Sequence, residues 1–147
     1  MKKICLSFLA GFFCFLIAAN NVTAHCEIPC GIYDDQVRIS MISEHITTIE
    51  KSMNQIMEIQ KEKKHNSNQL IRWVMNKENH AKELQEIVSQ YFMTQRIKFD
   101  ANDYDKKIGF LHQMLVYAMK CKQTTDLGNI QKLQEALKGF EALYFAK

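Results

Sequence analysis

Residues 25–33, with the sequence HCEIPCGIY, bring together several potential metal ligands. His25 offers an imidazole, and Cys26 and Cys30 offer two thiols within six residues. Cleavage of the chain after Ala24 would add the α-amine of His25 to the same short hook. Nitrogen and thiolate donors packed this closely suit a transition metal in tetragonal coordination. The segment therefore predicts a metal site at a processed N-terminus.

Residues 1–24 are predicted to be a cleaved signal peptide. Lys2 and Lys3 give a positive start, and an apolar run of 16 residues follows from Ile4 to Ala19. A membrane-spanning helix needs about 20 apolar residues. An uncleaved membrane anchor is the alternative, but the run is short and no basic stop follows it.

The junction before the hook has the small residues of a cleavage site, with Val22 at −3 and Ala24 at −1. We expect a maturation protease to cut after Ala24 and the product to be exported, either periplasmic or secreted. Specialised processing in an organelle or in the cytoplasm would use a similar leader. No membrane association is expected after processing.

The hook resembles the H-C-x-x-P-C-G-x-Y motif of nickel superoxide dismutases. Six residue types are shared at the same spacing, and they are His25, Cys26, Pro29, Cys30, Gly31 and Tyr33. The resemblance extends to the length and helical layout of residues 25–147. It implies an oxidoreductase, an antioxidant enzyme that converts superoxide to O₂ and H₂O₂ with one nickel ion per subunit.

By this resemblance, nickel is bound equatorially by the α-amine of His25, the amide nitrogen and thiolate of Cys26, and the thiolate of Cys30. The His25 imidazole is the axial ligand. Such electron-rich donors make nickel(III) accessible, so the metal can cycle between Ni(II) and Ni(III). Pro29 turns the chain so that Cys30 returns to the metal, and Gly31 allows close backbone approach, although both also suit an ordinary turn.

Two further features of the site are open. Tyr33 stands beside the metal by the resemblance and gates small anions there, or it packs the hook against the bundle. Some family members hold the axial imidazole with a glutamate and an arginine, and the glutamate position falls here near Ser40 and Met41, which are not acidic. Glu44, Arg72 and His80 are candidate substitutes, and none can be assigned from the sequence.

The composition narrows the class of protein. Without Lys2 and Lys3, 17 basic residues stand against 16 acidic residues, which argues against a nucleic-acid-binding protein. Three cysteines follow residue 24. In an exported chain Cys26 and Cys30 would form a disulfide when no metal is bound, and Cys121 lies in a helical apolar pattern as a buried thiol.

Past the hook, residues 34–147 are predicted to be an all-α, antiparallel four-helix bundle. Asp34 or Asp35 caps a first helix that ends near Lys61, and a second runs from about Gln69 to about Gln95. Asn102 or Asp103 caps the third, and a turn at 124–128 precedes the fourth. The apolar positions recur at steps of three and four. They are Ile39, Ile42, Ile46, Ile49, Met53 and Ile56; Leu70, Val74, Ala81, Leu84, Val88 and Tyr91; Ile108, Leu111, Leu115 and Ala118; and Ile130, Leu133, Leu137, Phe140 and Tyr144.

The resemblance also implies a homohexamer of such bundles. Trp73, Phe92, Phe110 and Tyr117 are placed on outer faces as subunit contacts, or they belong to a monomer's core. His45, His65, His80 and His112 include no i, i+4 pair, so a histidine-based site inside the bundle is only weakly indicated.

Two alternatives to an enzyme fit the same hook. One is a non-enzymatic secreted protein that binds copper or nickel, which would not need Gly31 and Tyr33 at their positions. The other is a small secreted helical interaction protein whose N-terminal loop is closed by a disulfide. Catalytic consumption of superoxide and titration of free thiols distinguish these from a nickel enzyme.

Overall fold

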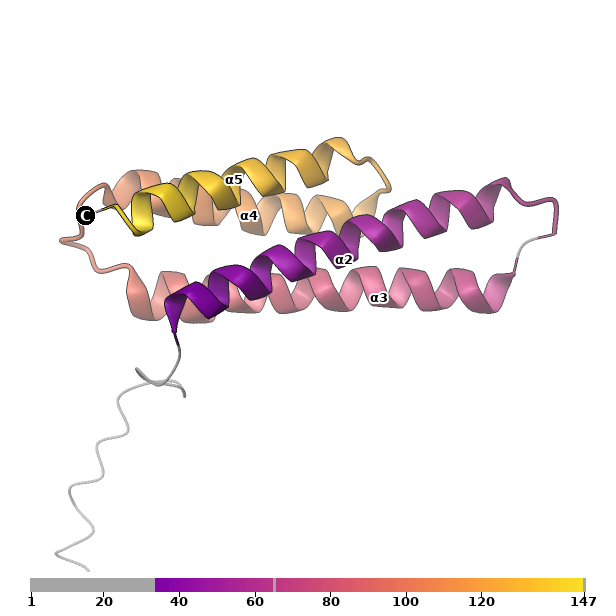
Figure 1. Ribbon diagram of the computed structural model, residues 1–147, viewed down its shortest axis with the longest axis horizontal. Helices are drawn as coiled ribbons and strands as arrows, with labels where there is room; N and C mark the ends of the chain where they lie inside the picture. The colour runs from indigo at the N-terminus through magenta and orange to yellow at the C-terminus, as the bar shows by residue number, and fades with distance from the viewer. Residues whose placement is uncertain (1–33, 65, 147) are drawn as a thin grey trace, which may run out of the picture.

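The computed structural model describes residues 34–64 and 66–146. They form α2 (Asp35–Lys61), α3 (Ser67–Glu86) with its continuation η2 (Ile87–Arg96), α4 (Tyr104–Gln123) and α5 (Gly128–Tyr144) (Figure 1). No strand occurs among these residues. The predicted all-α four-helix bundle is confirmed.

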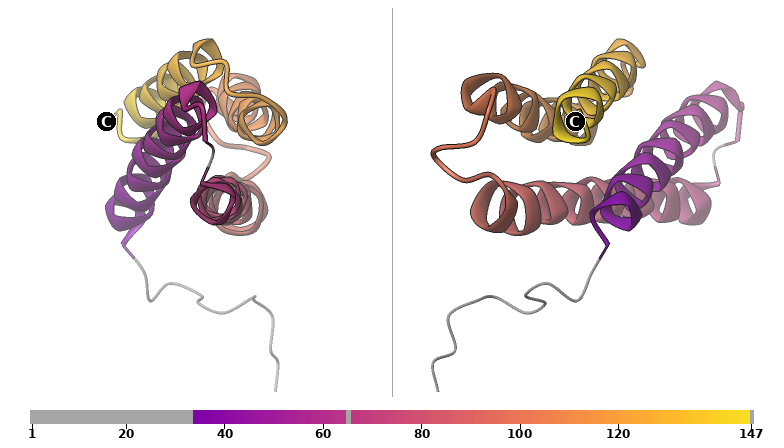
Figure 2. Two further views of the ribbon diagram at one scale, coloured as in Figure 1. Left: turned by 90° about the vertical axis from the view of Figure 1, so that its right-hand side faces the viewer. Right: turned by 60° about the vertical axis from the view of Figure 1, so that its left-hand side comes forward.

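The bundle consists of two helical hairpins. α2 packs most extensively against α3, and α4 packs against α5 (Figure 2). The far ends of α2 and α3, with the loop between them, extend beyond the α4–α5 hairpin (Figure 1). The start of α2, the end of η2 and the C-terminal end of α5 meet at the opposite end of the bundle.

The core confirms most of the predicted stripes. Every apolar position predicted for the first helix is buried, from Ile39 at 3 % exposed to Ile42, Ile49 and Met53 at 0 %. Burying each such side chain stabilises a fold by about 1.5–3 kcal/mol. Val74 is an exception, at 37 % exposed. It lies on the part of α3 that extends past α4, so no second hairpin covers it.

The helix starts follow the predicted signals in part. The Asp34 carboxylate accepts a hydrogen bond from the amide of Gln36 at 2.8 Å, as expected of an N-cap. Asp103 precedes α4 as predicted, but it has a left-handed backbone, with φ 53°. Its carboxylate pairs with the Lys106 ammonium at 2.8 Å and makes no capping hydrogen bond.

The second helix changes type over its last ten residues. α3 passes without a break into η2, a π-helix, in which each backbone turn closes over five residues. Tyr91 and Phe92 of η2 both lie in the core, at 4 % and 0 % exposed. Of the two alternatives for Phe92, an outer subunit contact or a core residue, the structure shows the core.

Lys77 ties the two hairpins together from inside the bundle. Its side chain is only 5 % exposed and lies 3.4 Å from the carboxylate of Glu78. Its ammonium donates to the backbone carbonyls of Cys121, at 2.7 Å, and of Lys122, in the last turn of α4. A cation is favourable there because the carbonyls at a helix C-terminus lack backbone partners.

Among the described residues, none of the helices combines the length and the apolar character that a membrane crossing requires.

Candidate metal centre

The predicted ligands of the hook lie outside the described residues. His25, Cys26, Cys30 and Tyr33 all precede Asp34, where the structure begins. Their assignment as ligands and as a gating residue stays a prediction. The structure does define the attachment point, because Tyr33 is bonded to Asp34 and Asp34 caps α2.

A network of polar side chains fixes this attachment point. Asp35, the first residue of α2, accepts hydrogen bonds from the Arg96 Nε atom at 2.9 Å and from the Tyr144 hydroxyl at 2.8 Å. The Tyr91 hydroxyl also donates to Asp35, and Arg96 donates to that hydroxyl at 2.9 Å. We call Asp35, Tyr91, Arg96 and Tyr144 the Asp35 cluster. It joins α2, η2 and α5 two residues after the hook.

The electrostatics of the cluster favour an ionised Asp35. Burial raises the pKa of this carboxyl, but hydrogen bonds from Tyr91, Tyr144 and Arg96 together outweigh burial and lower it. Burial, with the hydrogen bond to Asp35, raises the pKa of Tyr144. The charges therefore stay fixed near neutral pH, with an anion between a cation and two neutral hydroxyl donors.

Two arginines place positive charge around the Tyr91 ring. The guanidinium carbons of Arg96 and Arg38 lie 4.6 Å and 5.2 Å from the ring centroid. Asp35 is the acidic partner of Arg96 in this group, at 2.9 Å.

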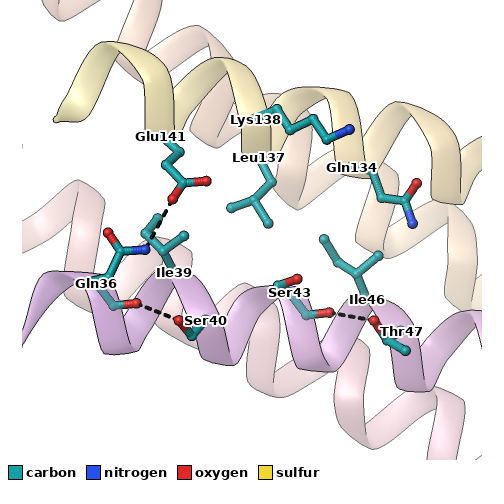
Figure 3. Close-up of a pocket in the computed structure, with 10 residues that line it drawn as sticks. All are labelled: Gln36, Ile39, Ser40, Ser43, Ile46, Thr47, Gln134, Leu137, Lys138 and Glu141. Carbon is teal, nitrogen blue, oxygen red and sulfur yellow. Dashed lines mark hydrogen bonds between the residues drawn. The ribbon is translucent and has the colours of Figure 1, made fainter. Parts of the chain in front are cut away.

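A shallow groove runs from this end of the bundle between α2 and α5 (Figure 3). At its end Gln36 donates to the Glu141 carboxylate at 3.1 Å, and further along it is lined by Ile39, Ser43, Leu137 and Lys138. Its acidic and basic side chains are not grouped around a common point (Figure 3). The groove therefore shows no catalytic arrangement of its own.

The candidate substitutes for the axial-ligand contacts lie elsewhere. Glu44 is exposed on α2, and His80 hydrogen-bonds His45 in the middle of the α2–α3 pair. Arg72 precedes Tyr91 by 19 residues on the α3–η2 segment, a separation of roughly 28 Å along a helix. The arginine beside the start of α2 is Arg96, which the sequence analysis did not single out.

The structure also brings together a group that the sequence analysis missed. His45 on α2 and His80 and Glu83 on α3 converge, with the two imidazole Nδ1 atoms 2.8 Å apart. Searching each helix for i, i+4 pairs could not find them because they lie on two helices. The signal was available in His80 and Glu83, which are three residues apart on one face.

Comparison with protein families identifies the chain. The model of the nickel-containing superoxide dismutase family matches residues 20–147. The chain belongs to this family. The searches of curated proteins and of solved structures gave no match to this chain. Family membership confirms the recognition from the hook, the enzyme class and nickel as the cofactor.

The donor chemistry of this chain fits nickel at the hook. The thiol outside residues 1–33 is Cys121, which is 0 % exposed on α4. Burial raises its pKa to about 11, so it is a neutral thiol near pH 7. The predicted role of Cys121 as a buried apolar residue is confirmed. Cys26 and Cys30 are thus the cysteines after residue 24 that are suited to supply thiolates.

Proposed function

We propose that this nickel superoxide dismutase performs its reaction at a processed N-terminus that begins with His25. The α-amine of His25, the amide nitrogen and thiolate of Cys26 and the thiolate of Cys30 would hold the metal, and the His25 imidazole would be a further ligand. Bound nickel supplies one-electron exchange between Ni(II) and Ni(III). Two superoxide ions and two protons then give one O₂ and one H₂O₂. The family match carries this proposal.

The described residues contribute an anchor for the hook. Asp34 and Asp35 fix the chain directly after Tyr33, and the hydrogen bonds of Asp35 reach η2 and α5. A catalytic site on a short segment keeps its geometry only where its base is rigid. We assign the Asp35 cluster as a positioning group and Tyr33 as the residue that controls anion access.

The proposal includes three steps of maturation. The leader, residues 1–24, directs export to the periplasm or outside the cell, a protease cuts after Ala24, and the chains assemble as homohexamers. Ile71, Val74 and Met75 support assembly because they are 62 %, 37 % and 56 % exposed on the part of α3 that extends past α4. Exposed apolar side chains gathered on one face are typical of subunit contacts.

The decisive experiment combines N-terminal sequencing, metal analysis and superoxide turnover. We expect an N-terminal His25, nickel near one per chain, and loss of both nickel and turnover in Cys26→Ser and Cys30→Ser. Cys121→Ala is the matched control and keeps both, because its thiol is buried on α4. An uncleaved precursor that turns over superoxide at the mature rate would refute the role of the α-amine.

His25→Gln separates binding from turnover. Glutamine keeps the α-amine, so the nitrogen and sulfur donors of the equatorial plane persist, but it removes the imidazole. We expect nickel to be retained and most activity to be lost. Near-normal activity in this variant would exclude an axial role for the imidazole.

A further inference from the structure

We propose that His45, His80 and Glu83 form a second metal site, for a divalent transition-metal ion, in the middle of the α2–α3 hairpin. The Glu83 carboxylate lies 3.6 Å from Nδ1 of His45 and 3.9 Å from Nδ1 of His80. The two Nδ1 atoms are 2.8 Å apart. One ligand atom from each residue thus faces a common point, and all three lie within 4.8 Å of one another.

The helices position the three side chains from two directions. His80 and Glu83 are separated by three residues on α3 and therefore share a face. His45 approaches from α2, where it is 8 % exposed between the buried Ile42 and Ile49. Since α2 and α3 are closely packed, the two imidazoles are held in place before any ion binds.

The distances suit a metal after a small adjustment. Zinc–nitrogen bonds of about 2.0–2.1 Å in a tetrahedral site put neighbouring ligand atoms about 3.3 Å apart. The two nitrogens would separate by about half an ångström and the carboxylate would move inward by a similar amount. Glu83 can make this movement because its side chain is 57 % exposed. Without metal, one Nδ1 carries a proton and donates a hydrogen bond to the other Nδ1.

The ligand set defines the class of ion. Two imidazoles and one carboxylate favour Zn²⁺, Cu²⁺ or Ni²⁺ over Mg²⁺ or Ca²⁺, which prefer oxygen ligands. Three protein ligands leave a fourth position for water. The site contains no sulfur, so it differs chemically from the hook, and a bound ion would link α2 to α3.

The test uses Co²⁺, a coloured substitute for Zn²⁺, on the full chain in which His25→Gln, Cys26→Ser and Cys30→Ser remove the imidazole and both thiolates of the hook. We expect one Co²⁺ per chain, visible ligand-field bands, no thiolate charge-transfer band, and displacement by Zn²⁺. Adding His80→Gln or Glu83→Gln should weaken binding at least tenfold. His112→Gln is the matched control and should leave it unchanged, since His112 is exposed on α4.

Two results would overturn the proposal. One is the absence of stoichiometric Co²⁺ or Zn²⁺ binding to the chain that carries the three hook substitutions. The other is binding that neither His80→Gln nor Glu83→Gln weakens. Circular dichroism checks the fold of each variant. If His80→Gln does not fold, Glu83→Gln still tests the proposal, because the Glu83 side chain is exposed.

Discussion

Asp35 and Lys77 are both charged groups held by other helices, but their partners differ in kind. Asp35 accepts from side chains of η2 and α5 at the end of the bundle, and it is 31 % exposed. Lys77 is 5 % exposed and donates to backbone carbonyls in the last turn of α4. One contact is made two residues after the hook in the sequence, whereas the other joins α3 to the last turn of α4.

The difference shows how a small bundle can separate support of its metal centre from support of its fold. Backbone carbonyls are fixed by the helix itself, so the Lys77 contact stabilises the packing of the hairpins. The Asp35 cluster consists of side chains, and Asp35 follows the last residue of the hook by two positions in the sequence. We therefore expect changes at Lys77 to affect stability alone and changes at Asp35 to affect both stability and catalysis.

The largest expected effect on stability is that of Lys77→Met. Methionine fills the space but leaves the carbonyls of Cys121 and Lys122 without their buried donor. We expect the free energy of unfolding to fall by about 2 kcal/mol. Chemical denaturation measures this loss. Activity per bound nickel should stay unchanged, and Lys82→Met, at an exposed position on α3, is a control within about 0.5 kcal/mol of the parent.

Asp35→Asn should lower the free energy of unfolding somewhat less than Lys77→Met does, and it should also reduce activity. The amide cannot replace the charged acceptor for Arg96, so we expect a loss of about 1.5 kcal/mol. Activity per bound nickel should fall several-fold because the base of the hook is looser. Asp34→Asn is the matched control, since asparagine caps a helix as well as aspartate does. Equal activity in the two variants would remove the proposed link between Asp35 and the metal centre.

In acid, Asp35 should no longer stabilise the fold more than asparagine does at the same position. The pKa of Asp35 is lowered from its ordinary value of 3.8, so the unfolded chain takes up this proton at higher pH than the folded chain. The stabilisation is present above pH 3.8 and is lost as the pH falls through the lower pKa of the folded state. Unfolding free energies of the parent and Asp35→Asn should therefore converge in acid. A constant difference from pH 7 downward would contradict this.

The smallest effects distinguish two helical glycines of the α4–α5 hairpin. Gly109 has no atom within 4 Å of an added Cβ, so Gly109→Ala should stabilise by about 0.5–1 kcal/mol. A Cβ at Gly139 would lie 2.4 Å from the Phe110 ring. Gly139→Ala should therefore be less stable than Gly109→Ala, as thermal unfolding can show. Equal stability would mean that Phe110 moves aside without cost.

The sequence was sufficient to predict most of the architecture. Ile39, Ile42 and their successors on α2 define a buried face because helical periodicity is local. Val74 was misplaced because the sequence does not tell how far one hairpin extends past another. Whether Phe92 is an outer or a core residue was left open by the sequence, and the structure places it in the core.

The candidate sites also differ in how far the sequence could predict them. The ligands of the hook are close in sequence, so their pattern was enough to recognise the family. Asp35 meets Tyr144 across 109 residues, and His45 meets His80 across 35. Such contacts depend on the register between helices, which periodicity does not specify. The apolar-stripe tyrosines, Tyr91 (buried) and Tyr144 (partly buried), were a partial signal, since a buried hydroxyl usually needs a partner.

The π-helix changes the directions in which side chains point at the end of the bundle where α2 begins. Along an α-helix, residues five apart point in directions about 140° apart, so Tyr91 and Arg96 would diverge. In η2 the turn is wider and its backbone hydrogen bonds join residues five apart, so Tyr91 and Arg96 lie closer to one side of the helix. Their hydrogen bond of 2.9 Å is the result. The wider turns of η2 thus decide which way the Arg96 guanidinium points, beside the residue that follows the proposed nickel-binding segment by two positions.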